Sequence, residues 1–464
     1  MIWLLRLGAL ALALLSTPAV AAEPLTRMER SAIIKALEAG PEPAQAATGV
    51  VTSEALEAQL MAHARREAGL VAQPARLNRL WALEPAPRDL SAEWTSARAS
   101  GAAEAWIRSL SPADPRYRRL VAARRDYAAR VAAGSWTTLE TGQILRLGDD
   151  DPAVVALRTR LAAEGFETQT PEAPSLYDEA LEAAVRTYQE LRGLAADAVV
   201  GPATYRALNV SAAVRLAQID ANLERWRWLP RPLPAVRIEA DAGSARATLF
   251  VDAAPVLEMR IIVGAPSTKT PMFASEVETV VFNPPWNVPT SIARGEILPR
   301  AARDPGYLAR NNFTYQNGRL QQRPGPSNSL GQVKFDMASP FGVYLHDTPG
   351  RAAFLRPVRT LSHGCMRLEK PRELATLLLA SQGWTRETVD GAIAQGQTRR
   401  VDLAAPVPVF VVYSTAFVNE EGLHLLADPY GWDAQLTAAL QGQVLAQLDR
   451  DMAPPESECA SSAG

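Results

Sequence analysis

The sequence predicts a multidomain α+β protein, with helical domains before residue 235 and a β-rich domain after it. Three observations support this prediction. The 464 residues are more than one ordinary hydrophobic core accommodates, so two or three domains are expected. Apolar residues recur at helical spacing up to about residue 230, and from residue 235 they alternate with polar residues as in strands. A polar stretch, residues 291–331, then interrupts the alternation and predicts a long insertion.

The N-terminus has the pattern of an export signal. A basic start ends at Arg6, an apolar core runs through residues 7–15, and small residues at 19–22 offer a cleavage site. The apolar core is short for a membrane span, and a retained N-terminal anchor is the alternative. We therefore expect residues 1–22 to be a signal peptide and the mature chain to be exported.

Two helical domains are expected next. Residues 23–143 are rich in Ala, Leu, Glu and Arg and predict a helical scaffold without chemistry, in which His63 should lie at the surface. Residues 144–209 predict a small module of three short helices. Asp151-Pro152 supplies a cap and a first-turn proline for the first helix, and Gly201-Pro202 begins the third.

The remainder of the chain is predicted to be mainly β-structure. Residues 210–234 form a helix and a proline-rich linker, and residues 235–415 form the β-rich domain. Residues 416–464 are interpreted as a C-terminal extension with a disordered tail, in which His424 is structural. Strands are expected at residues 236–240, 247–251, 257–263, 277–282, 332–335 and 408–413.

Cys365, one of two cysteines in the chain, is the candidate nucleophile. It lies in the run Ser362-His363-Gly364-Cys365-Met366-Arg367, and His346 precedes it by nineteen positions. A thiol is mostly protonated at neutral pH, so a nucleophilic cysteine needs a base nearby. His346 is the candidate base, and strand alternation places Tyr344 on the same face. Gly364 permits a tight turn in which the amides of Gly364 and Cys365 point at an oxyanion.

Other interpretations of Cys365 remain open. A lone cysteine is usually a small buried hydrophobic residue, and a cysteine with two histidines could be a zinc site. No second cysteine or acidic ligand stands at metal-site spacing, so we predict no metal and no cofactor. Cys459 is interpreted as incidental, because a structural disulfide with Cys365 would remove the nucleophile, and occasional oxidation of the pair is the alternative.

These motifs resemble known families. His346 with the run 362–367 is similar to the signature of the L,D-transpeptidases, which have a YkuD-type catalytic domain. Residues 283–294 and 304–312 resemble the large Gram-negative, YcbB-like subgroup, and the likeness covers about residues 235–415. Residues 184–204 resemble the peptidoglycan-binding domain of wall hydrolases, with a helical spacer that binds nothing as the alternative.

The resemblance implies a mixed β-sandwich and roles for individual residues. Residues 291–331 would form a cap over the active cleft. The main-chain carbonyl of Asp347 would orient His346, with its carboxylate as the less favoured choice. Tyr344, Ser362 and Arg367 are candidate substrate contacts, although Arg367 could instead hold the loop. His363 either lowers the pKa of the thiol or is structural.

The function implied by the resemblance is peptidoglycan L,D-transpeptidation in the periplasm. Cys365 would attack a tetrapeptide stem between diaminopimelate and the terminal D-alanine, forming a thioester that passes to the side-chain amine of another stem. Transfer to water or to a wall-attached protein, and a non-catalytic wall-binding scaffold, are the alternatives. Partners would be stem peptides and glycan, with other wall-synthesis proteins as further candidates. A formal charge of −2 without a dominant basic patch predicts no nucleic-acid partner.

Overall fold

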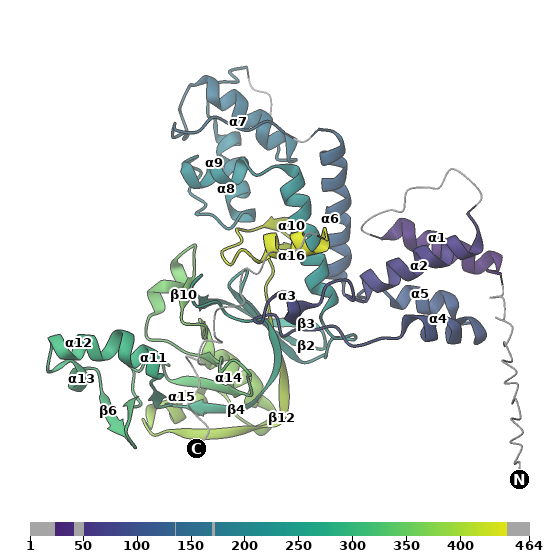
Figure 1. The fold of residues 1–464 in the computed structure, drawn as a ribbon. Coiled ribbons are helices and arrows are strands. Elements are labelled where there is room, and N and C mark those ends of the chain that lie inside the picture. The colour runs from purple at the N-terminus through teal and green to yellow at the C-terminus, as the bar shows by residue number, and fades with distance from the viewer. Residues whose placement is uncertain (1–23, 41–50, 135, 169–171, 443–464) are drawn as a thin grey trace, which may run out of the picture.

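The computed structural model describes residues 24–40, 51–134, 136–168 and 172–442. The predicted signal peptide, residues 1–22, and Cys459 lie outside these ranges. Figure 1 shows a β-rich domain, a group of N-terminal helices beside it and a small helical module on the far end of two long helices. The predicted multidomain α+β fold is confirmed. Within the described ranges, no helix combines the length and apolarity that crossing a membrane requires.

The N-terminal helices pack around a core of their own, which includes Ile33, Leu60 and Trp94. The side chains of Thr26 and Thr52 cap the first two helices by accepting backbone N–H groups. His63 is only 6% exposed, so the prediction of a surface position is wrong. The helices of this region are α1 (Arg27–Ala39), α2 (Ser53–Glu67), α3 (Pro74–Leu77), α4 (Leu90–Ala99), α5 (Ala103–Ser109) and α6 (Pro115–Ala132).

The module contains α7 (Pro152–Ala163), α8 (Glu179–Leu191) and α9 (Pro202–Leu208). The Asp151 carboxylate accepts the Ala153 amide at 2.8 Å, and Asp178 caps α8 in the same way. Apolar faces of the three helices meet in one core, whose members include Val154, Leu157, Leu161, Leu181, Val185, Tyr188 and Leu208. Local caps and helical spacing therefore produce the module.

A buried carboxylate joins the module to the rest of the molecule. Glu164 is 7% exposed and accepts hydrogen bonds from Arg192 at 2.8 Å and from Tyr127 of α6 at 2.7 Å. Arg160 forms an ion pair with it at 3.0 Å. Burial alone would raise the pKa of Glu164, but the two arginines hold it below its ordinary value. Arg192 also donates to the Leu423 carbonyl at 3.2 Å, so Glu164 links the module to both α6 and the C-terminal segment.

The β-rich domain is one sheet that closes on itself. Its order is β10-β3-β11-β9-β8-β4-β12-β1-β2, and β3 also pairs with β2, so the sheet encloses the main core. The last predicted strand begins earlier than expected, because a register shift between Asp402 and Val407 lets β12 continue through its prolines. Its strands are β1 (Arg237–Asp241), β2 (Arg246–Val251), β3 (Ala254–Gly264), β4 (Phe273–Phe282), β8 (Val333–Met337), β9 (Leu345–His346), β10 (Thr360–Ser362), β11 (Met366–Leu368) and β12 (Arg399–Val412).

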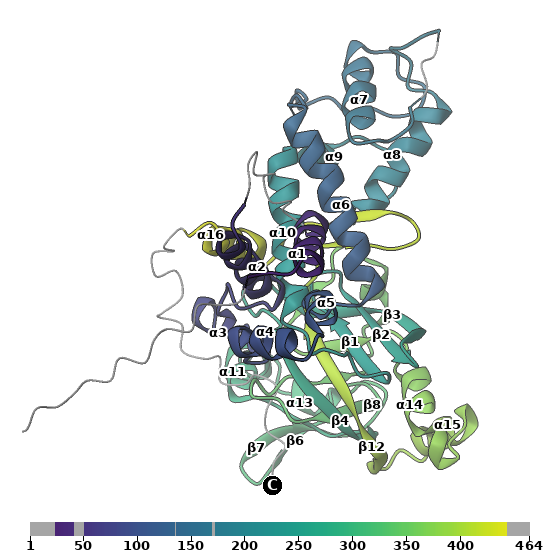
Figure 2. The same ribbon diagram turned by 90° about the vertical axis from the view of Figure 1, so that its right-hand side faces the viewer.

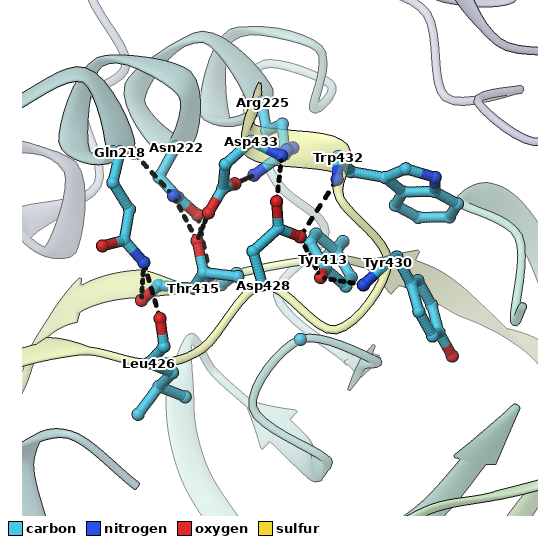
Figure 3. Close-up of polar contacts among 12 residues, drawn as sticks. Gln218, Asn222, Arg225, Tyr413, Thr415, Leu426, Asp428, Tyr430, Trp432 and Asp433 are labelled. Atoms are coloured by element: carbon cyan, nitrogen blue, oxygen red, sulfur yellow. Dashed lines mark hydrogen bonds and ion pairs between the residues drawn. The ribbon is translucent and has the colours of Figure 1, made fainter. Parts of the chain in front are cut away.

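The C-terminal extension folds back onto α10 (Ala212–Arg227), which lies against α6 between the module and the sheet (Figure 2). The extension contains β13 (Ala416–Val418), β14 (Leu423–Leu425) and α16 (Trp432–Leu440). His424 stacks on Phe417 with ring centroids 4.6 Å apart, which is a structural position. Figure 3 shows the buried polar contacts between α10 and this segment, among them the 2.6 Å ion pair of Arg225 with Asp433.

We expect Glu164→Ala to lower the free energy of opening of the module by about 3–5 kcal/mol, because it leaves two buried arginines unpaired. Hydrogen exchange of α7 and α8 measures this value. Glu190→Ala is the matched control, since Glu190 lies exposed on α8 of the same module. Equal protection in the two variants would show that the cluster around Glu164 contributes nothing to the joint.

Candidate active site

The candidate nucleophile and base meet because two short strands pair. β9 and β11 are parallel neighbours, with Met366 opposite Leu345 and Arg367 opposite His346. Cys365 immediately precedes β11 and His346 ends β9. Both line one pocket of about 190 Å³ together with four other predicted site residues, Tyr344, Ser362, His363 and Arg367.

The His346 ring is oriented by a main-chain carbonyl. Its Nδ1 lies 2.5 Å from the Asp347 oxygen, which can only accept, so Nδ1 carries the proton and Nε2 is the basic nitrogen. The Asp347 carboxylate instead accepts the Gln332 amide at 2.9 Å. Gly331, at φ +65°, makes this arrangement possible, since a Cβ there would lie 2.4 Å from Asp347 Cγ.

His346 is neutral at physiological pH. Burial, and then the positive charge of Arg367, lower the pKa of His346 to about 3. The imidazole is therefore in the form that accepts a proton. In the reduced protein, a thiolate at Cys365 would favour the imidazolium and oppose this shift.

The loop before Cys365 is closed by its own serine. Ser362 Oγ donates to the Cys365 carbonyl at 2.6 Å and accepts the Gly364 amide at 3.1 Å, while Gly364 adopts φ +114°. The Gly364 amide thus donates to Ser362 in this arrangement, and its oxyanion role stays a prediction. Both hydrogen bonds of the Ser362 hydroxyl are made within the turn, and its predicted contact with substrate stays a prediction. The Cys365 amide is the other predicted oxyanion donor.

Cys365 is disulfide-bonded in the structure. The interpretation of Cys459 as an incidental cysteine that can be oxidised on occasion stays a prediction. The other cysteine of the sequence, Cys459, lies outside the described residues. Any chemistry that starts from the Cys365 thiolate requires the reduced protein, since a disulfide sulfur is not a nucleophile toward a carbonyl.

His363 and Arg367 differ in their partners. His363 Nε2 lies 2.7 Å from Glu296 Oε1, so its side chain faces the insertion. Arg367 Nε is buried without a hydrogen-bond partner, and no ion pair of Arg367 occurs within the described part of the chain. Loop support by Arg367 is thus not seen. Whether His363 influences the thiol stays a prediction.

Comparison with known proteins places this site in a family. Residues 235–408 match the model of the "L,D-transpeptidase catalytic domain", and residues 150–208 match a "Putative peptidoglycan binding domain". The chain contains an L,D-transpeptidase catalytic domain. A Haemophilus influenzae protein named "Putative L,D-transpeptidase" is 35% identical over 243 residues, which are 48% of this chain and 49% of that protein.

Other similarities are shorter or more distant. The N-acetylmuramoyl-L-alanine amidase CwlM of Mycobacterium tuberculosis is 43% identical over 77 residues, 15% of this chain and 19% of that one. A solved L,D-transpeptidase from Stackebrandtia nassauensis covers 59% of this chain and 97% of its own, at 12% identity and a TM-score of 0.24. A solved L,D-transpeptidase from Xylanimonas cellulosilytica covers 59% of this chain and 98% of its own, at 16% identity and a TM-score of 0.20.

The insertion in the L,D-transpeptidase domain has a core of its own. Ile292, Ile297 and Leu320 form an apolar cluster with Trp286 and Phe313, and four of these five residues also line the pocket of Cys365. The polar composition of residues 291–331 did not predict this core, although the apolar spacing from Val288 to Ile297 could have indicated it. Its elements are β5 (Trp286–Asn287), α11 (Thr290–Ile292), a π-helical turn (Ala293–Ile297), α12 (Leu298–Arg303), α13 (Tyr307–Arg310), β6 (Phe313–Gln316) and β7 (Arg319–Gln322).

No group of three or more His, Cys, Asp or Glu side chains able to hold a metal ion occurs in the described ranges. Cys365 and His346 instead lie beside an arginine, and a cationic neighbour disfavours binding of a second cation. The residues around the nucleophile are therefore suited to an anionic ligand.

The low pKa of His346 predicts a pH-dependent stability. Between about pH 3 and 6.5 the unfolded chain binds a proton at His346 that the folded chain excludes, so stability falls as the pH falls through this window. We compare urea unfolding of Cys365→Ala with that of Cys365→Ala/His346→Gln. Both variants lack the thiolate and the disulfide, so they differ only at residue 346. As the pH falls, the free energy of unfolding of Cys365→Ala should decrease by up to about 1.4 kcal/mol per pH unit more than that of the double variant. Parallel pH profiles would contradict the burial of a neutral imidazole.

Proposed function

We propose that this protein is a peptidoglycan L,D-transpeptidase that acts in the periplasm through a thioester at Cys365. The observation that carries the proposal is the shared pocket, which Cys365, His346 and Arg367 all line. A nucleophile, a base in the correct tautomer and a site for negative charge are what acyl transfer from a peptide acid requires.

In the first step, His346 Nε2 accepts the thiol proton while Cys365 Sγ attacks the carbonyl carbon of the donor peptide bond. The C–N bond then breaks, and the imidazolium returns its proton to the departing amine. A thioester remains on Cys365. The hydrogen bond to the Asp347 carbonyl keeps the ring in place during both proton transfers.

In the second step, the neutral imidazole accepts a proton from the acceptor amine as this amine attacks the thioester. The C–S bond breaks, a new amide forms and the thiol recovers its proton. The insertion covers the pocket with Ile292, Ile297 and Phe313, and this apolar wall would exclude the water that competes with the amine.

Arg367 is the candidate contact for a carboxylate of the donor stem. Glu296 is the acidic residue that interacts with Arg367 electrostatically, but its carboxylate lies 2.7 Å from His363 and 3.7 Å from Arg300. The guanidinium of Arg367 therefore retains a positive charge that a ligand can neutralise. A bidentate arginine–carboxylate pair would fix the donor relative to Cys365.

The remaining parts of the proposal concern location and the wall. The module at residues 150–208 would hold peptidoglycan, and the export signal predicted at residues 1–22 would bring the chain to the periplasm. Stem peptides would serve as donor and acceptor. Other wall-synthesis proteins are further candidate partners.

Cys365→Ala should form no cross-linked dimer from tetrapeptide muropeptides, and His346→Gln should be slower by roughly two to four orders of magnitude. Products are identified by liquid chromatography and mass spectrometry, with a reductant present because Cys365 is disulfide-bonded in the structure. His424→Gln, which changes a histidine remote from the pocket, should retain activity. Dimer from Cys365→Ala would refute the thioester, and tripeptide without dimer from the unmodified protein would make it a carboxypeptidase.

Arg367→Gln should raise the KM for a donor with free carboxylates about tenfold to a hundredfold, the usual effect of losing a charge-assisted hydrogen bond. Two further donors, amidated either at the C-terminal carboxylate or at the side-chain carboxylate, identify the group that is bound. Amidating that group should weaken binding to the unmodified protein but not to Arg367→Gln. Arg356→Gln, in an exposed loop, is the control. Equal losses with every donor would mean that Arg367 binds no carboxylate.

A further inference from the structure

The turn between β3 and β4 holds the loop that carries Cys365. Thr270 Oγ1 donates to the Gly364 carbonyl at 2.8 Å, and Thr268 Oγ1 donates to the Ser362 carbonyl at 2.8 Å. Gly364 directly precedes Cys365, so the hydrogen bond from Thr270 helps to fix the backbone position of Cys365. Thr270 is fully buried and also accepts the Gly264 amide at 2.8 Å.

Tyr430, in the C-terminal segment, holds this turn through hydrogen bonds to its backbone. Its hydroxyl donates to the Gly264 carbonyl at 2.7 Å and accepts the Thr270 amide at 3.2 Å. Tyr430 is 4% exposed, so water cannot replace either bond when the hydroxyl is removed. Two backbone groups of the turn therefore depend on one side chain.

The Tyr430 ring is held in turn by the C-terminal segment. It stacks on Tyr413 with centroids 5.1 Å apart and meets the edge of Trp432 at 4.9 Å. The Tyr430 amide donates to the Tyr413 hydroxyl at 3.2 Å, and that hydroxyl donates to Asp428 at 2.5 Å. Figure 3 shows these groups next to the contacts with α10, with the Tyr430 hydroxyl directed away from the helix.

We propose that Tyr430 is a positioning residue for the nucleophile, supplied by a segment outside the matched catalytic domain, which ends at residue 408. The hydroxyl acts through two links, from Tyr430 to Thr270 and from Thr270 to the Gly364 carbonyl. Its kinetic role rests on the thioester chemistry proposed above. The catalytic domain then needs the C-terminal segment for activity as well as for packing.

Tyr430→Phe tests this role in the whole, reduced chain. We expect kcat for acylation by a tetrapeptide donor to fall about tenfold to a hundredfold, the effect of a small misplacement of a reacting group, with KM little changed. Tyr117→Phe is the matched control, because it removes a buried hydroxyl that donates to Glu67 at 2.9 Å and contacts neither the turn nor the stack around Tyr430. It should lower the melting temperature to a similar extent and leave kcat close to that of the unmodified protein.

Thr270 tests the second link and covers the case in which Tyr430→Phe fails to fold. Thr270→Ser keeps the hydroxyl and should retain activity, whereas Thr270→Val should lose it. Equal kcat in Tyr430→Phe and Tyr117→Phe, or full activity in Thr270→Val, would overturn the proposal. Absence of any acyl-enzyme in the unmodified reduced protein would instead refute the proposed function, so the two failures are distinguishable.

Discussion

The candidate active site depends on the parallel pairing of β9 with β11. This contact places His346 opposite Arg367 and brings Cys365 to the same pocket. The two strands contain only two and three residues, so their own ladder supplies few hydrogen bonds. Their arrangement is supported by neighbours: Gly331 leaves space for the Asp347 side chain, and Ser362 closes the turn before Cys365. Tight packing around a weak ladder is a general way to place reacting groups.

Features determined by short-range chemistry could be predicted from the sequence. Asp151 caps α7 because an aspartate followed by proline favours a helix start, and period-two alternation located strands such as β1 and β4. His346 and Cys365 were identified as a pair because their residue types are chemically complementary. The orientation of His346 by the Asp347 carbonyl followed from a family resemblance and could not have been derived from spacing alone.

Features determined by long-range contacts could not be predicted. The buried position of His63 depends on which face of α2 meets its neighbours, and the engagement of the Gly364 amide depends on the rotamer of Ser362. The contribution of Tyr430 joins residues separated by more than 150 positions. No periodicity records such a contact, because each partner looks like an ordinary buried residue in its own segment.

The salt-linked joint at Glu164 also has a mechanical consequence. Domains joined by flexible linkers search a volume, and their mutual encounter is set by an effective concentration that falls with linker length. Here the module lies against paired helices, and Glu164 binds Tyr127 of α6 and Arg192 of the module, which restricts the movement of the module relative to these helices. A polymer gripped at α7–α9 would be sampled at one distance and one angle from Cys365. Only sites on the polymer that lie at this distance and angle from the bound segment would then reach the pocket of Cys365.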